Sequence, residues 1–139
     1  METPGSKDLE TIDQRSQTIA NGLVYGLGAL EFTQSVVSRP LVVAEPNDLP
    51  KLTEHLRTYI LALTVEVSEF LQENNWKPWR SKSTPVDPKL IEGEFVDILA
   101  FLGIIIHLIL RMYPQITLSS IATAYVEKSL VNLRRIKRD

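Results

Sequence analysis

Two acidic pairs with the same spacing, each inside an apolar helical segment, constrain the fold of this 139-residue chain most strongly. Glu66 and Glu69 lie three residues apart, and so do Glu94 and Asp97. Residues i and i+3 share one face of a helix, so each pair sets two carboxylates side by side. Carboxylates gathered in apolar surroundings repel one another and do not all stay ionised without cations. The pattern therefore predicts two packed helices that hold a divalent cation between them.

A single pair of this kind is more typical of a solvated helix face, but two pairs on consecutive helices favour a shared site. A di-iron bundle would need Glu-x-x-His on two helices, and neither His55 nor His107 has an acid three residues before it. His107 follows Asp97 by about 15 Å along a helix, so we expect a hydrogen-bonded core histidine. Ligation by oxygen alone favours Mg²⁺, with Mn²⁺ as a substitute, over iron or zinc.

Apolar residues recur at intervals of three and four along most of the chain, which predicts an all-α fold. The predicted helices span residues 9–37, 52–74, 88–113 and 117–137, with Thr117 capping the last. Residues 1–8 are expected to be disordered. We predict one domain over residues 1–139, a four- to five-helix bundle.

The segment Ile98–Leu110 is apolar on every side, apart from His107. It is shorter than the roughly 20 residues of a membrane span, so a buried core helix is expected. One small bundle covers such a helix poorly, which favours completion by oligomerisation, as a homodimer or homotetramer.

Charge and cysteine content restrict the partners. The net charge is −2, so neither a membrane nor a stable nucleic-acid partner is expected. The chain has no cysteine, which excludes disulfides and thiolate metal sites and is compatible with the cytoplasm, where we expect the protein. The N-terminus lacks the apolar segment of a secretory signal.

Candidate substrate-binding residues lie in two further places. Trp76, Lys77 and Trp79 crowd the loop after the first acidic pair, where aromatic faces could stack a nucleobase and the cation could hold phosphate. The alternative is that the tryptophans anchor the loop on the core. In the last predicted helix, a stripe at intervals of three and four residues could meet phosphates: Tyr125, Lys128, Asn132 and Arg135. The alternative is a basic helix end that complements the helix dipole.

These motifs resemble the all-α nucleoside triphosphate pyrophosphatases, the superfamily of MazG-like proteins, dimeric dUTPases and dCTPases. The resemblance rests on E-V-S-E at 66–69, E-F-V-D at 94–97, W-K-P-W at 76–79 and Y-x-x-K-x-x-x-N-x-x-R at 125–135. It implies a helical bundle assembled as a dimer or tetramer. It also implies a Mg²⁺ site at Glu66, Glu69, Glu94 and Asp97. Phosphate or nucleotide contacts are implied at Lys128, Asn132 and Arg135.

The implied activity is that of a hydrolase acting on phosphoric anhydrides. It would cleave a nucleoside triphosphate between the α and β phosphates, giving a nucleoside monophosphate and pyrophosphate. Glu66 or Glu69 would accept the proton of the attacking water. The tryptophan motif most resembles the dUTPase and dCTPase branches, so dUTP or dCTP is the expected substrate. The alternatives are a broad pyrophosphatase for noncanonical nucleotides and a non-catalytic helical module that binds nucleotides or a protein partner.

Overall fold

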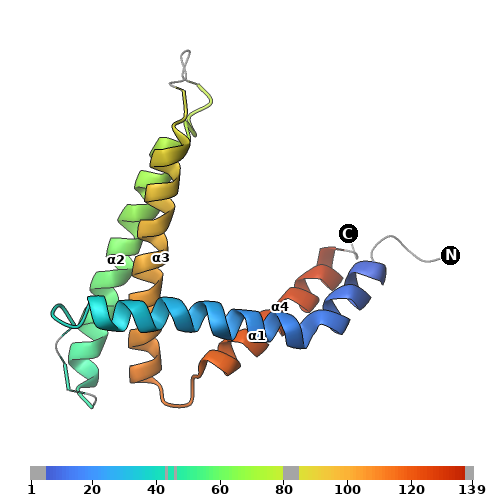
Figure 1. Ribbon diagram of the computed structural model, residues 1–139, viewed down its shortest axis with the longest axis horizontal. Coiled ribbons are helices and arrows are strands. Elements are labelled where there is room, and N and C mark those ends of the chain that lie inside the picture. The colour runs from blue at the N-terminus through green and yellow to red at the C-terminus, as the bar shows by residue number, and fades with distance from the viewer. Residues whose placement is uncertain (1–5, 43, 46, 80–84, 137–139) are drawn as a thin grey trace. The chain divides into compact units, whose positions relative to one another are not determined.

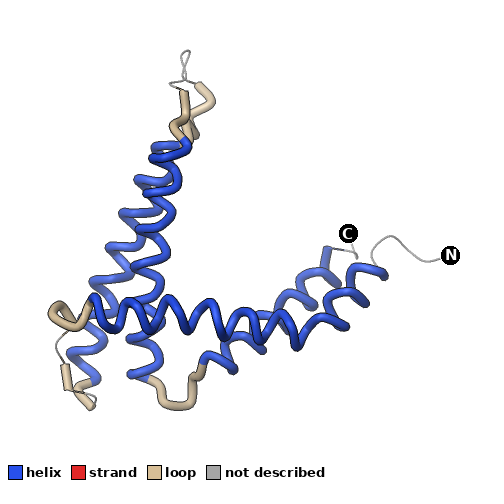
Figure 2. Tube along the Cα trace, viewed as in Figure 1, coloured by secondary structure: helices blue, strands red, loops and turns tan. Residues whose placement is uncertain are grey.

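The computed structural model describes residues 6–42, 44–45, 47–79 and 85–136. Four helices account for most of them, and no strand occurs among these residues (Figures 1 and 2). The helices are α1 Ser6–Val37, α2 Leu49–Glu73, α3 Pro88–Met112 and α4 Leu118–Ile136. The predicted all-α class is confirmed. The prediction of disorder was wrong for residues 6–8, which form the first turn of α1, and residues 1–5 lie outside the described residues.

Side-chain caps explain where three of the helices begin. Asp48 accepts a hydrogen bond from the Lys51 amide, and α2 therefore starts three residues earlier than the apolar pattern predicts. Asp87 accepts one from the Lys89 amide at the start of α3. Before α4, the hydroxyl of Thr117 accepts from the Ser120 amide while the Ser120 hydroxyl accepts from the Thr117 amide, a reciprocal cap that confirms Thr117 at this position.

The chain forms two compact units, and α1 contributes to both. Residues 1–29 and 114–139 make the α1/α4 unit, in which Ala122 and Val126 are buried. Residues 30–113 make the α2/α3 unit, which holds both acidic pairs. In this second unit α2 and α3 lie side by side, joined at one end by the loop that carries the tryptophans (Figure 1).

The core of the α2/α3 unit is built where α2, α3 and the segment after α1 meet. Its buried side chains are Val42, Leu52, Tyr59, Ile104, Ile105 and Leu108. The ring of Tyr59 packs against that of Phe101 with centroids 6.1 Å apart. The C-terminal half of α3 is therefore buried within a single chain, although its composition predicted that a second chain would be needed to cover it.

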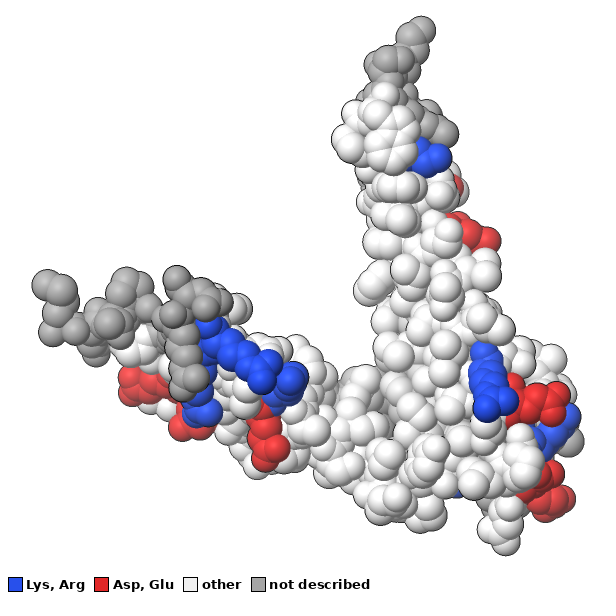
Figure 3. Space-filling view, turned by 180° about the vertical axis from the view of Figure 1, so that it is seen from behind, with Lys and Arg blue, Asp and Glu red and all other residues white. Residues whose placement is uncertain are grey.

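Exposed apolar side chains in the α2/α3 unit lie on α2, on the N-terminal half of α3 and on the end of α1, where Phe32 is 69% exposed. Leu61, Val65, Phe95 and Val96 are each about half exposed or more. Seen from behind, most of the surface over these two helices carries no charge (Figure 3). Among the described residues, α3 is also the one helix with the length and hydropathy of a membrane span, a property shared by core helices of soluble proteins.

Candidate metal centre

Three carboxylates from the two long helices of the α2/α3 unit converge. One oxygen each of Glu66, Glu94 and Asp97 lies within 4.8 Å of the other two. Glu66 comes from α2, and Glu94 and Asp97 come from neighbouring turns of α3. Glu66 and Glu94 are partly buried, whereas Asp97 is exposed. The antiparallel packing of α2 and α3 thus brings together three of the four carboxylates of the predicted site, and Glu69 lies outside the group.

Two oxygens of this cluster are buried without a partner. Glu66 Oε2 and Glu94 Oε2 are shielded from solvent, and no donor among the described residues bonds to either. Burial raises the pKa of Glu66, and the charges of Glu69, Asp97 and Glu94 raise it further. Burial also raises the pKa of Glu94, with the charges of Glu69, Asp97 and Glu73 adding to the effect. The ionised cluster therefore costs free energy unless positive charge enters it.

The donor set fits a hard divalent cation. Every candidate ligand is a carboxylate oxygen, the type that Mg²⁺ and Mn²⁺ prefer. Two oxygens bound to one Mg²⁺ at about 2.1 Å can lie at most about 4.2 Å apart, which is close to the 4.8 Å limit within which the three carboxylate oxygens lie. The two unpartnered oxygens would gain the partner that the protein does not supply. Glu66, Glu94 and Asp97 would hold the ion.

Two more glutamates surround the three ligands. Glu69 is exposed and lies outside the group of converging oxygens, yet its charge acts on both Glu66 and Glu94. Glu73 is partly buried and acts on Glu94, although the paired motif does not include it. The sequence indicates that Glu73 lies near the site, because it follows Glu69 by four residues and Glu66 by seven, which keeps all three on one face of α2.

The tryptophan loop starts directly after this acidic face. Trp76 and Trp79 pack edge to face with ring centroids 5.5 Å apart, and the Lys77 ammonium lies 5.6 Å from the centroid of Trp76. Trp79 is 69% exposed and Trp76 is 40% exposed. The two rings therefore contact each other and leave aromatic surface accessible, which is not the arrangement of side chains that anchor a loop in the core.

The basic stripe of α4 belongs to the other unit. Tyr125, Lys128, Asn132 and Arg135 are all exposed, and all lie in the α1/α4 unit, whereas the acidic cluster lies in the α2/α3 unit. Tyr125 borders a small hollow beside Ile12 and Ile19 of α1. The role of this stripe in phosphate binding therefore stays a prediction.

His107 is hydrogen-bonded, as predicted. Its Nδ1 lies 2.8 Å from Glu31 Oε1, and both side chains are largely buried. Because a carboxylate only accepts, Nδ1 carries the proton and Nε2 is left for another partner. Sequence analysis did not identify Glu31 as the partner, since 76 residues separate the two and only the crossing of α1 over α3 joins them.

Comparison with known proteins agrees with this geometry. A family model described as dUTPase matches residues 42–112, just over half of the chain. The match covers all of α2 and α3, both acidic pairs and the tryptophan loop. No curated protein matches the chain, and neither does any solved structure. With its matched segment forming the paired acidic helices of an all-α fold, the chain belongs to this dUTPase family.

Proposed function

We propose that the protein is a Mg²⁺-dependent nucleoside triphosphate pyrophosphohydrolase whose preferred substrate is dUTP. It would cleave between the α and β phosphates and release dUMP and pyrophosphate. Family membership supports a hydrolase of this class, and it favours uracil over cytosine as the base. The observation that carries the proposal is the convergence of three carboxylates, two of them with a buried, unpartnered oxygen.

The cluster divides into ligands and a base. Glu66, Glu94 and Asp97 converge and are the proposed ligands. Mg²⁺ bound to them would neutralise charge on the phosphate oxygens and lower the pKa of a nearby water. Glu69 lies outside the converging group and is exposed, so its carboxylate can reach a water beside the cluster and accept its proton. We therefore assign Glu69 as the general base in preference to Glu66.

Recognition of the nucleotide is assigned to the tryptophan loop and to the basic stripe of α4. The exposed face of Trp79 would stack on the base, with Trp76 fixing its orientation and Lys77 supplying positive charge. Lys128, Asn132 and Arg135 would contact the phosphates. The exposed apolar surface of α2 and α3 would be covered in a homodimer or homotetramer. We place the enzyme in the cytoplasm, with its nucleotide substrates.

A substrate panel tests the proposal. Pyrophosphate release is measured with Mg²⁺ from dUTP, dCTP, dTTP, dATP and a deaminated purine triphosphate. Glu66→Gln and Asp97→Asn should each lower kcat/KM more than about a hundredfold, since loss of supporting groups alone costs metal sites tenfold to a hundredfold. Glu92→Gln is the matched control, because Glu92 lies on α3 but is exposed and pairs with Lys89.

The outcomes separate the competing functions. Preference for dCTP would move the assignment to the other pyrimidine, and equal rates on all substrates would favour a broad pyrophosphatase. Nucleotide binding without any hydrolysis would favour a non-catalytic module. Metal binding has its own measurement: Mg²⁺ should raise the Tm of the wild type and of Glu92→Gln but not that of Asp97→Asn. Full turnover in excess EDTA would refute the metal centre.

A further inference from the structure

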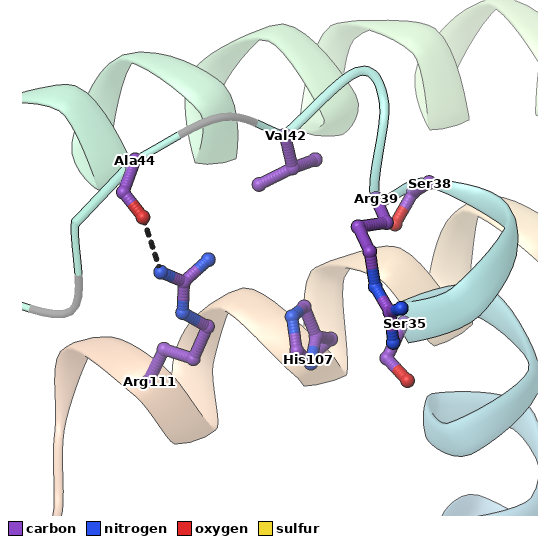
Figure 4. A pocket seen from close by; sticks show the side chains of 7 residues that line it. All are labelled: Ser35, Ser38, Arg39, Val42, Ala44, His107 and Arg111. Atoms are coloured by element: carbon purple, nitrogen blue, oxygen red, sulfur yellow. Dashed lines mark hydrogen bonds between the residues drawn. The ribbon is translucent and has the colours of Figure 1, made fainter.

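A polar pocket lies in the α2/α3 unit, away from the acidic cluster. It has a volume of about 340 Å³ and is formed by the end of α1, the segment that follows it, and the last turns of α3. Its charged or titratable lining residues are Arg39, His107 and Arg111 (Figure 4). On α3, Arg111 follows Asp97 by fourteen residues, about 21 Å along the helix. The pocket is therefore distinct from the proposed metal centre.

The pocket carries positive charge that is only partly neutralised. Among the described residues, Glu31 is the one carboxylate bonded to its lining, through His107 Nδ1. Arg111 donates from Nη2 to the carbonyl oxygen of Ala44 at 2.7 Å, which uses one of five guanidinium N–H groups. No hydrogen bond or ion pair within the described part of the chain engages the guanidinium of Arg39. Two guanidinium groups thus face the pocket against a single carboxylate.

The directions of these groups select a class of ligand. Figure 4 shows Arg39 and Arg111 on opposite sides of the pocket, with His107 between them on α3. A carboxylate offers two oxygens in one plane, and one arginine fork satisfies both. A phosphate group presents its oxygens in several directions, so it can meet donors on two sides at once, and a protonated phosphate oxygen can donate to His107 Nε2, because the ring proton lies on Nδ1. Ser35 and Ser38 also line the pocket, but their hydroxyls already donate to the carbonyl oxygens of Phe32 and Gln34.

We propose that Arg39, His107 and Arg111 form a binding site for a phosphate-class oxyanion, either free or at the end of a nucleotide. Arg39 and Arg111 supply charge-assisted hydrogen bonds, and the bond from Arg111 to Ala44 holds its fork in place. The Glu31 carboxylate keeps the proton of His107 on Nδ1 and fixes the direction of the ring. This site does not depend on the proposed hydrolysis.

Calorimetric titration of the full-length chain without divalent cations tests the proposal, because the anionic acidic cluster then repels the probe. Inorganic pyrophosphate is one probe and dUMP the other, which separates a free anion from a nucleotide phosphate. Arg39→Gln should weaken binding about tenfold or more. Arg39 is exposed and makes no side-chain bond within the described residues, so the fold should survive, as an unchanged Tm would verify. Arg57→Gln is the matched control, an exposed arginine on α2 outside the pocket.

Binding of either probe that is weakened by Arg39→Gln and unchanged by Arg57→Gln supports the site. Chemical-shift changes of the His107 ring on titration provide a second, local readout that should be present in the wild type and diminished in Arg39→Gln. Absence of binding of both probes at millimolar concentration would overturn the proposal. Equal weakening by both substitutions would also overturn it, because the effect would then reflect only overall charge.

Discussion

α1 and α3 approach closely at Gly103, and replacing this residue with alanine should destabilise the α2/α3 unit. A Cβ atom at Gly103 would lie 2.6 Å from the carbonyl oxygen of Leu30 and 2.7 Å from Cγ of Gln34. The first of these neighbours is backbone and cannot rotate away. Overpacking of this kind costs about 1–3 kcal/mol, offset by about 1 kcal/mol from the better helix propensity of alanine.

Gly93 offers the matched control on the same helix. Nothing lies within 4 Å of a Cβ built there, so Gly93→Ala should gain helix propensity without any clash. The difference in the free energy of unfolding between the two alanine variants, from urea titration, then isolates the packing cost at about 1–3 kcal/mol. Displacing this part of α1 should also break the bond between Glu31 and His107, seen in the His107 ring resonances. Equal stability of the two variants would refute the close crossing.

Three further predictions follow from charge and exposure. Because the pKa of Glu94 is raised, the folded state binds more protons than the unfolded state, and metal-free wild type should lose stability as pH rises above about 4.3. Glu94→Gln should then be more stable than the wild type at neutral pH. Tm measured against pH in EDTA checks both expectations. Val96→Glu should dissociate the oligomer, as measured by light scattering, whereas Gln72→Glu should not. A monomeric wild type would contradict the proposed assembly. Arg135→Ala should lower kcat/KM about tenfold or more, whereas Arg15→Ala should not. Equal losses that shrink with added salt would mean that Arg135 contributes only surface charge and does not contact the substrate.

Helix positions and the pairing of the acids were predictable from local patterns. Apolar intervals, Pro88 and Thr117 located all four helices to within about three residues, because these signals act within a turn or two of chain. α1 begins three residues before its predicted start, since Ser6–Asp8 lack an apolar period and are helical through continuity with the turns that follow. The meeting of Glu66 with Glu94 and Asp97 followed from equal spacing on two neighbouring helices.

Long-range contacts were not predictable in this way. The pairing of Glu31 with His107 and the pocket bordered by Arg39 and Arg111 depend on where α1 crosses α3. The absence of a side chain at Gly103 allows the close approach of α1, and one glycine in an apolar helix does not reveal its partner. Likewise, the even hydropathy of α3 gave no indication that its C-terminal half is covered within the chain while Phe95 stays exposed.

The edge-to-face pair of Trp76 and Trp79 makes the protein its own spectroscopic probe. The chain has only these two tryptophans, and both lie in the loop next to the acidic face. All indole emission therefore originates from one place, so quenching or a wavelength shift on adding nucleotide reports that loop without any label. Rings 5.5 Å apart also couple their transitions, so the circular dichroism of the pair responds when the geometry of the two rings changes.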